Sequence, residues 1–164
     1  MSTPPTIAQG ATGPNVRWAQ YLLVRQTLSY TDIDGVFGPK TKSAVEQFQQ
    51  YQNLTVDGIV GPHTWAALGG SKPKPPTLHN GDHTSVVEKL QLALNEGRGD
   101  FAPASDPVLA LDGIFGPQTE IAVKGTQHEN HIAADGVVGL QTWAVPIHAA
   151  GQTLADICGV TPPG

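Results

Sequence analysis

An eight-residue sequence that begins with Asp-Gly occurs four times in this chain. The copies start at Asp34, Asp57, Asp112 and Asp135, and each has Gly at its second and fifth positions and Thr at its eighth. The copies within a pair start 23 positions apart, and the two pairs start 78 positions apart. Because repeated supersecondary units give repeated sequence at a fixed spacing, the pattern predicts two similar modules, each containing two copies of the motif.

Matches outside the motifs help to set the limits of the modules. Val16, Gln20 and Leu23 match residues 71 positions later, whereas the motifs match 78 positions later. Seven extra residues are therefore expected in the second module, within a surface loop at 95–107. The predicted order is given by residue ranges: module 1 at 5–69, a semi-rigid Pro-rich linker at 70–76, module 2 at 77–148 and a C-terminal tail at 149–164 with a weakly helical stretch.

The motif itself predicts how a helix begins. Asp-Gly favours a turn with Gly at positive φ, and Gly-Pro places Pro at the first helical position. Apolar residues before the first motif recur at helical spacing, as in Val16, Ala19 and Leu23. We therefore expect an all-α fold with three helices per module. The residues assigned to the motifs and to the short helices after them are Gly35, Phe37, Gly38, Pro39, Thr41, Gly58, Gly61, Trp65, Asp112, Gly113, Phe115, Gly116, Asp135, Gly136, Gly139 and Trp143.

Charge and composition exclude several classes of function. The 164 residues carry a net charge of -5, and from residue 77 onward three basic residues face ten acidic ones. Binding to nucleic acid needs clustered Lys and Arg, which this chain lacks. No stretch has the length and hydropathy of a membrane span or a secretory signal, so we expect synthesis in the cytoplasm. The single Cys158 closes no intramolecular disulfide.

The motif residues resemble those of the small peptidoglycan-binding domain family. That family shows a Val-x-x-Leu-Gln-like helix, then Asp-Gly-x-Phe-Gly-Pro-x-Thr, Ala-Val, Phe-Gln and a closing Asp-Gly-x-x-Gly-x-x-Thr-Trp. Module 1 matches from Ile7 to Leu68, and module 2 matches from Leu78 to Trp143. The resemblance implies a non-catalytic helical module that attaches proteins to bacterial peptidoglycan, without a cofactor.

The second module departs from the family pattern at four positions. Thr126 stands where Phe48 is expected, Gly125 interrupts the second helix, Leu140 replaces the helix-starting Pro, and Pro146 replaces the last core Leu. A Gly within a helix costs about 0.5–1 kcal/mol relative to Ala, and loss of the Phe removes core area. We therefore expect module 2 to be the less stable one.

Other chemistry has less support in the sequence. His128 and His131 have helical spacing but lack the zinc protease motif, and His131 aligns with Asn53 at a helix end. Cys158 has no base near it in sequence and is expected to be a small buried residue. The acidic residues around Gly35 lack the spacing of a calcium loop. We expect no metal, no catalytic residue and no enzymatic activity.

Roles for the aromatic and acidic residues follow from their positions. The four motif aspartates are expected to accept backbone N–H groups in turns. Trp65 and Trp143 occupy equivalent apolar positions and are expected in the cores, whereas Trp18 has Lys89 as its counterpart and is expected to be partly exposed. The predicted ligand contacts are Arg17, Trp18, Gln20, Asp34 and Asp57.

Peptidoglycan is the first predicted partner, bound by two weak modules that gain strength from being linked. Two alternatives remain open. One is a structural or docking subunit of a phage tail or phage-like injection particle, which contacts other particle subunits. The other is the wall-targeting subunit of a lysin whose hydrolase is a separate chain. The expected site of action is the cell wall, the extracellular space or such a particle.

Overall fold

The computed structural model describes residues 4–24, 26–71, 74–97, 108–146 and 152–160. These residues fall into two compact units that divide between Lys74 and Pro75. The described residues form helices and isolated β-bridges, which confirms the predicted all-α class with two tandem helical modules.

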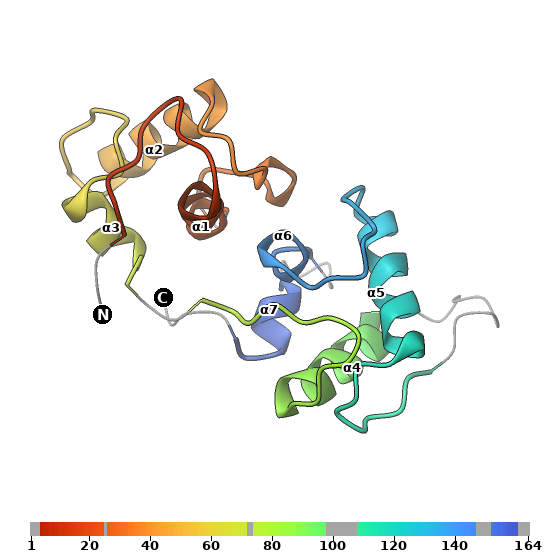
Figure 1. The fold of residues 1–164 in the computed structure, drawn as a ribbon. Coiled ribbons are helices and arrows are strands. Elements are labelled where there is room, and N and C mark those ends of the chain that lie inside the picture. The colour runs from red at the N-terminus through yellow and green to blue at the C-terminus, as the bar shows by residue number, and fades with distance from the viewer. Residues whose placement is uncertain (1–3, 25, 72–73, 98–107, 147–151, 161–164) are drawn as a thin grey trace. The chain divides into compact units, whose positions relative to one another are not determined.

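The described residues of unit 1 form three α-helices and one short 3-10 helix, which are coloured red to yellow in Figure 1. Their bounds are α1 Pro14–Leu23, η1 Tyr30–Asp32, α2 Pro39–Tyr51 and α3 Pro62–Leu68. Both α2 and α3 pack against α1. Each α-helix begins with Pro, whose fixed φ suits the first helical turn and whose missing N–H would be unpaired there.

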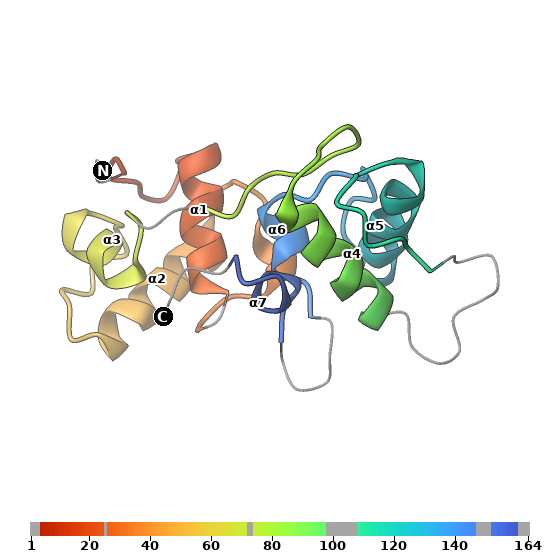
Figure 2. The same ribbon diagram turned by 90° about the horizontal axis from the view of Figure 1, so that it is seen from below.

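Within the described ranges, unit 2 has four α-helices, which are coloured green to blue in Figure 2. Their bounds are α4 Ser85–Gly97, α5 Pro117–Glu129, α6 Leu140–Trp143 and α7 Leu154–Ile157. Helix α4 packs against α5 and α7, and α6 packs against α7. The first three helices correspond in order to those of unit 1, and α7 is an addition.

The core of each unit includes side chains from its helices and from its motif loops. Val16, Ala19 and Leu23 of α1 are buried, as are Ala44, Val45 and Phe48 of α2. The fourth residue of each motif is also buried, in the order Phe37, Val60, Phe115 and Val138. Removal of this apolar surface from water is the main favourable contribution to folding.

The segment before the first helix of each unit lies against the motif loops. Ile7 forms an antiparallel bridge with Val60, and Leu78 forms the equivalent bridge with Val138. The indole N–H of Trp65 donates to the carbonyl of Pro5 at 2.9 Å, and that of Trp143 donates to the carbonyl of Pro76 at 2.8 Å. Both tryptophans are buried, as predicted, and each binds the start of its own unit.

Two of the positions at which module 2 departs from the family pattern, Gly125 and Pro146, affect the structure differently. Gly125 was expected to interrupt the second helix, but α5 runs continuously from Pro117 to Glu129. Gly125 is exposed and a Cβ there would meet nothing within 4 Å, so packing of the neighbouring turns is undisturbed. Helix α6 has only four residues, whereas α3 has seven, and Pro146 lies exposed just beyond it.

The segment predicted as a C-terminal tail supplies part of the core of unit 2. Its helix α7 has a capping box, in which the Thr153 hydroxyl accepts from the Asp156 N–H and the Asp156 carboxylate accepts from the Thr153 N–H. Leu154, Ala155 and Cys158 are buried. Where Leu68 closes unit 1, unit 2 has Pro146 and then this additional helix. The predicted surface loop at 95–107 falls mostly outside the described residues.

Candidate functional site

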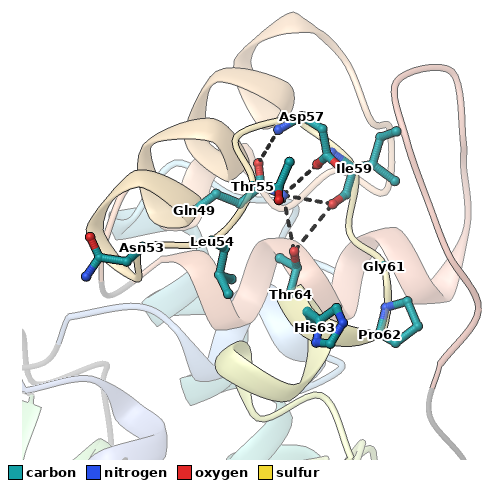
Figure 3. Close-up of a pocket in the computed structure, with 10 residues that line it drawn as sticks. All are labelled: Gln49, Asn53, Leu54, Thr55, Asp57, Ile59, Gly61, Pro62, His63 and Thr64. Carbon is teal, nitrogen blue, oxygen red and sulfur yellow. Dashed lines mark hydrogen bonds between the residues drawn. The ribbon is translucent and has the colours of Figure 1, made fainter.

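A buried glutamine organises the loop between α2 and α3 (Figure 3). The Gln49 Nε2 donates to Asp57 Oδ1 at 2.8 Å, to the Ile59 carbonyl at 3.0 Å and to Thr64 Oγ1 at 3.1 Å. The Gln49 Oε1 accepts from the N–H groups of Asp57 and Gly58. One carboxamide thus connects the start, middle and end of the motif, and buried polar groups of this kind need such partners.

The same network is present at all four motifs. A glutamine from the preceding helix donates to the motif Asp, to the carbonyl two residues later and to the motif Thr, while it accepts the N–H of the motif Gly. The four glutamines are Gln20, Gln49, Gln91 and Gln127, and all are buried. The conformation of each motif loop is therefore fixed by the motif residues together with one buried glutamine of the preceding helix.

The motif aspartates make the turns that the sequence predicted. The Oδ1 of Asp57 accepts the N–H of Ile59 at 3.0 Å, and the other three copies repeat this bond. The hydrogen bond from the Ile59 N–H, followed by that from the Gln49 amide, lowers the pKa of Asp57 below its usual value. The equivalent bonds from Ile114 and Gln91 lower the pKa of Asp112.

Asp34 makes the equivalent bonds, and burial has a larger effect on its pKa than on that of Asp57. Burial raises its pKa, but hydrogen bonds from the Val36 N–H and the Gln20 amide together outweigh burial, so the net shift is downward. The carboxylates of Asp34, Asp57 and Asp112 are therefore ionised at neutral pH, and each is used in the geometry of its own loop.

Gly58 shows why the second motif position requires Gly. Its φ is 70°, a region that disfavours side chains, and its N–H donates to Gln49 at 3.0 Å. A Cβ at this position would lie 2.9 Å from the Cγ of Lys42, which forms an ion pair with Glu46 at 3.6 Å. Backbone conformation and close packing therefore act together at this residue.

Two of the predicted ligand contacts are not on the surface. Trp18 was expected to be partly exposed, but it is fully buried: its indole N–H donates to the Gly70 carbonyl at 2.9 Å and its ring stacks on Tyr21. The Lys74 ammonium also lies 5.6 Å from the centre of the Trp18 ring. Gln20 is fully buried because it is the glutamine of the first motif network.

The other three predicted contacts are exposed. Arg17 lies on α1 with its side chain over Gly35, while Asp34 and Asp57 hold their turns from the loop surface. Their contact with a ligand remains a prediction.

The residues singled out for metal or nucleophilic chemistry lie in ordinary structural positions. Within the described ranges, His, Cys, Asp and Glu form no group of three that could hold a metal ion. His131 has φ 57° at the end of α5, and Asn53 has φ 55° at the end of α2, so their alignment is confirmed. Burial raises the pKa of the Cys158 thiol to about 12, which disfavours the nucleophilic thiolate.

A pocket of about 430 Å³ lies beside the second motif of unit 1 (Figure 3). Its wall is formed by the loop after α2 and the first turn of α3. The lining residues are Gln49, Asn53, Leu54, Thr55, Asp57, Ile59, Gly61, Pro62, His63 and Thr64. The pocket combines apolar surface with neutral polar groups and one carboxylate, a mixture that suits a small polar ligand.

Sequence reasoning missed the glutamine network and the pocket. A signal for the network was present, because Gln49 and Gln127 each precede their motif Asp by eight positions and Gln20 aligns with Gln91. The pocket has no such signal, since residues 53–55 lie outside the repeated motif and differ between the modules.

In the part of the chain that the structure describes, no helix combines the length and apolar character needed to cross a membrane.

Comparison with known proteins gives a family and several relatives. The profile of the family described as "Putative peptidoglycan binding domain" matches residues 12–68 and 83–145. The N-acetylmuramoyl-L-alanine amidase CwlL of Bacillus licheniformis is 32% identical over 166 residues, which cover 87% of this chain and 45% of the amidase. The zinc D-Ala-D-Ala carboxypeptidase of Streptomyces albus G is 42% identical over 62 residues, which cover 37% of this chain and 24% of that enzyme.

A solved structure is also similar. The peptidoglycan-binding protein from Clostridioides difficile, in complex with glutamine hydroxamate, is 44% identical, with 42% of this chain and 43% of that chain covered and a TM-score of 0.38. The chain spans less than half the length of this structure and of the two curated relatives above. Both matched regions coincide with the paired motifs and their glutamine networks, and the chain belongs to the peptidoglycan-binding domain family, of which it contains two tandem copies.

Proposed function

We propose that this chain is a non-catalytic tandem module that binds the peptidoglycan of the bacterial cell wall. The observation that carries the proposal is the match of two separate regions, 12–68 and 83–145, to the peptidoglycan-binding family. Each region has its own core and its own pair of glutamine networks. Peptidoglycan is a repetitive polymer, so two linked modules find sites on the same strand or on neighbouring strands.

The environments of the motif aspartates and of Cys158 support a binding role rather than a catalytic one. The aspartates of the motif loops accept hydrogen bonds that fix turns, and the Cys158 thiol is buried with a raised pKa. A general acid or base needs a pKa near the operating pH, and the lowered values at Asp57 and Asp112 move away from it. The motif aspartates therefore stabilise the loops of the fold.

A second candidate function is the wall-targeting part of a lysin. The specific observation in its favour is the alignment of 87% of this chain with 45% of the Bacillus licheniformis amidase. In this version a hydrolase, either in a separate chain or in the same polypeptide, acts on the wall that the two modules hold.

Incubation with purified sacculi tests the proposal. We expect the chain to sediment with sacculi while the turbidity of the suspension and the set of soluble muropeptides stay unchanged. Release of muropeptides by the pure chain would show that it is an enzyme. Failure to sediment with sacculi of any chemotype would contradict wall binding.

A further inference from the structure

The pocket beside the second motif of unit 1 contains polar side chains that the fold does not use. Thr55 comes from the loop after α2 and His63 from the first turn of α3, while Asn53 directs its amide away from the other labelled residues (Figure 3). Thr55 and His63 are exposed, and among the described residues neither side chain makes a hydrogen bond, unlike Gln49, Asp57 and Thr64 in the same lining. The hydroxyl and the imidazole are therefore available to a ligand.

The charge of the pocket limits what that ligand can be. Asp57 is the one carboxylate among the lining residues, and no Lys or Arg is among them. A carboxylate in this pocket would face the like charge of Asp57, with no Lys or Arg in the lining to offset it. The stem peptides of peptidoglycan have free carboxylates, whereas N-acetylglucosamine, one of the two sugars of its glycan strands, is uncharged.

The size and the apolar surface agree with a sugar ring. The volume of about 430 Å³ lies within the range of small-molecule sites, about 300–1,000 Å³. Leu54, Ile59 and Pro62 give apolar surface for ring faces and an acetyl methyl group, and Ile59 remains 39% exposed although its backbone is fixed in the motif. The Gln49 network holds the wall in place, so binding would need little reorganisation.

Unit 2 has different side chains at the equivalent positions. With the offset of 78 positions that relates the motifs, Thr55 becomes Ala133, His63 becomes Gln141 and Pro62 becomes Leu140. The glutamine network is the same in both units, so the two loops share a framework but differ in the groups that they present.

We propose that this pocket of unit 1 binds an uncharged N-acetylated sugar of the glycan strand, with Thr55 and His63 as its polar contacts. The inference rests on the proposed function and specifies the component of peptidoglycan that unit 1 recognises. Unit 2, which lacks both side chains, does not share this contact.

A titration of the full chain tests the pocket. The probe is the β-1,4-linked tetrasaccharide of N-acetylglucosamine, which contains no peptide, and backbone amide chemical shifts report the site. We expect shifts at residues 53–64, and we expect the double variant T55A/H63Q, which carries the side chains of unit 2, to bind at least about tenfold more weakly. The control T77A/H128Q makes the same two changes at exposed positions of unit 2 and should leave affinity unchanged.

Three results would overturn the pocket assignment. They are equal affinity of T55A/H63Q and the wild type, absence of shifts at residues 53–64 up to about 10 mM tetrasaccharide, and shifts at these residues with a carboxylate-bearing stem peptide in place of the sugar. Sedimentation of the wild-type chain with sacculi separates this test from the proposed function. A chain that sediments but fails the titration binds the wall elsewhere, whereas a chain that does not sediment contradicts the proposed function itself.

Discussion

At the scale of single residues, the most informative side chains are the four buried glutamines. Each connects a helix to the loop that follows and replaces hydrogen bonds that water would otherwise supply to a motif Asp, Gly and Thr. The networks have donor–acceptor distances of 2.8–3.1 Å in every copy. Such a contact specifies one loop conformation, because any other leaves buried groups unpaired.

Substitution of Gln49 by Leu tests the importance of the network. The change leaves the Gly58 N–H and the Thr64 hydroxyl without their buried partner, and each such loss costs about 1–3 kcal/mol. We expect the free energy of unfolding of unit 1 to fall by about 2–4 kcal/mol, measured by urea denaturation. The neighbouring change Gln50→Leu, at an exposed position of α2, should stay within about 0.5 kcal/mol of the wild type. Similar losses for both variants would contradict the account.

The motif aspartates predict how stability depends on pH. Since hydrogen bonds lower the pKa of Asp34, Asp57 and Asp112 in the folded state, their contribution to stability is complete above the unfolded value of about 3.9. It is lost as the pH falls from there through the lowered folded values. Thermal melts between pH 6 and pH 2 should therefore show a falling Tm over the acidic part of this range. The variant D57N keeps an acceptor oxygen but cannot ionise, so its Tm should fall less steeply; an unchanged slope would contradict this role of Asp57.

The roles of many single residues could be predicted from the sequence, and those that could not depend on contacts between distant parts of the chain. The turn role of the aspartates and the burial of Trp65 and Trp143 follow from repetition, because equivalent residues in repeats have equivalent environments. The counterpart of Trp18 in unit 2 is Lys89, so repetition does not indicate its environment, and its contacts include Gly70 and Lys74, which lie more than fifty positions away. Periodicity within a helix cannot reveal contacts of this range.

At the scale of elements, the two units differ at their third helix. Helix α3 has seven residues and ends at Gly69 in a left-handed conformation, which is a common helix C-terminus. Helix α6 has four residues, and Pro146 stands where Leu68 closes the first unit. The additional helix α7 then packs against α4 and α6. The sequence indicated a weak helix there but not its burial, since four residues are too few to define an amphipathic pattern.

Substitution of Leu154 by Ala measures the contribution of α7. Leu154 is fully buried, and truncation of such a side chain costs about 2–5 kcal/mol. We expect this loss in the unfolding transition of unit 2, followed by urea denaturation. The control Ile121→Ala removes apolar surface from α5 at a position that is 55% exposed and should have a much smaller effect. Equal effects would show that α7 is not part of the core.

At the scale of the whole molecule, the chain presents the same framework twice with different surface groups. Linkage makes the second binding event intramolecular, so the apparent affinity for a polymer can exceed that of one module by about 10²–10⁴ without any new contact. The gain requires that the connection lets both modules reach the polymer. Duplication and fold class were predictable from the sequence, whereas the pocket of unit 1 was not, because residues 53–55 of its lining lie outside the repeated motif.

Sedimentation with sacculi, compared for the full chain and for each unit alone, is the decisive measurement of wall binding by the two linked modules. Circular dichroism first establishes that each separate unit is helical. We expect the full chain to bind sacculi at least about tenfold more tightly than unit 1 alone, and we expect unit 1 to retain measurable binding. A full chain that sediments no better than an unrelated acidic protein of the same size would contradict this expectation.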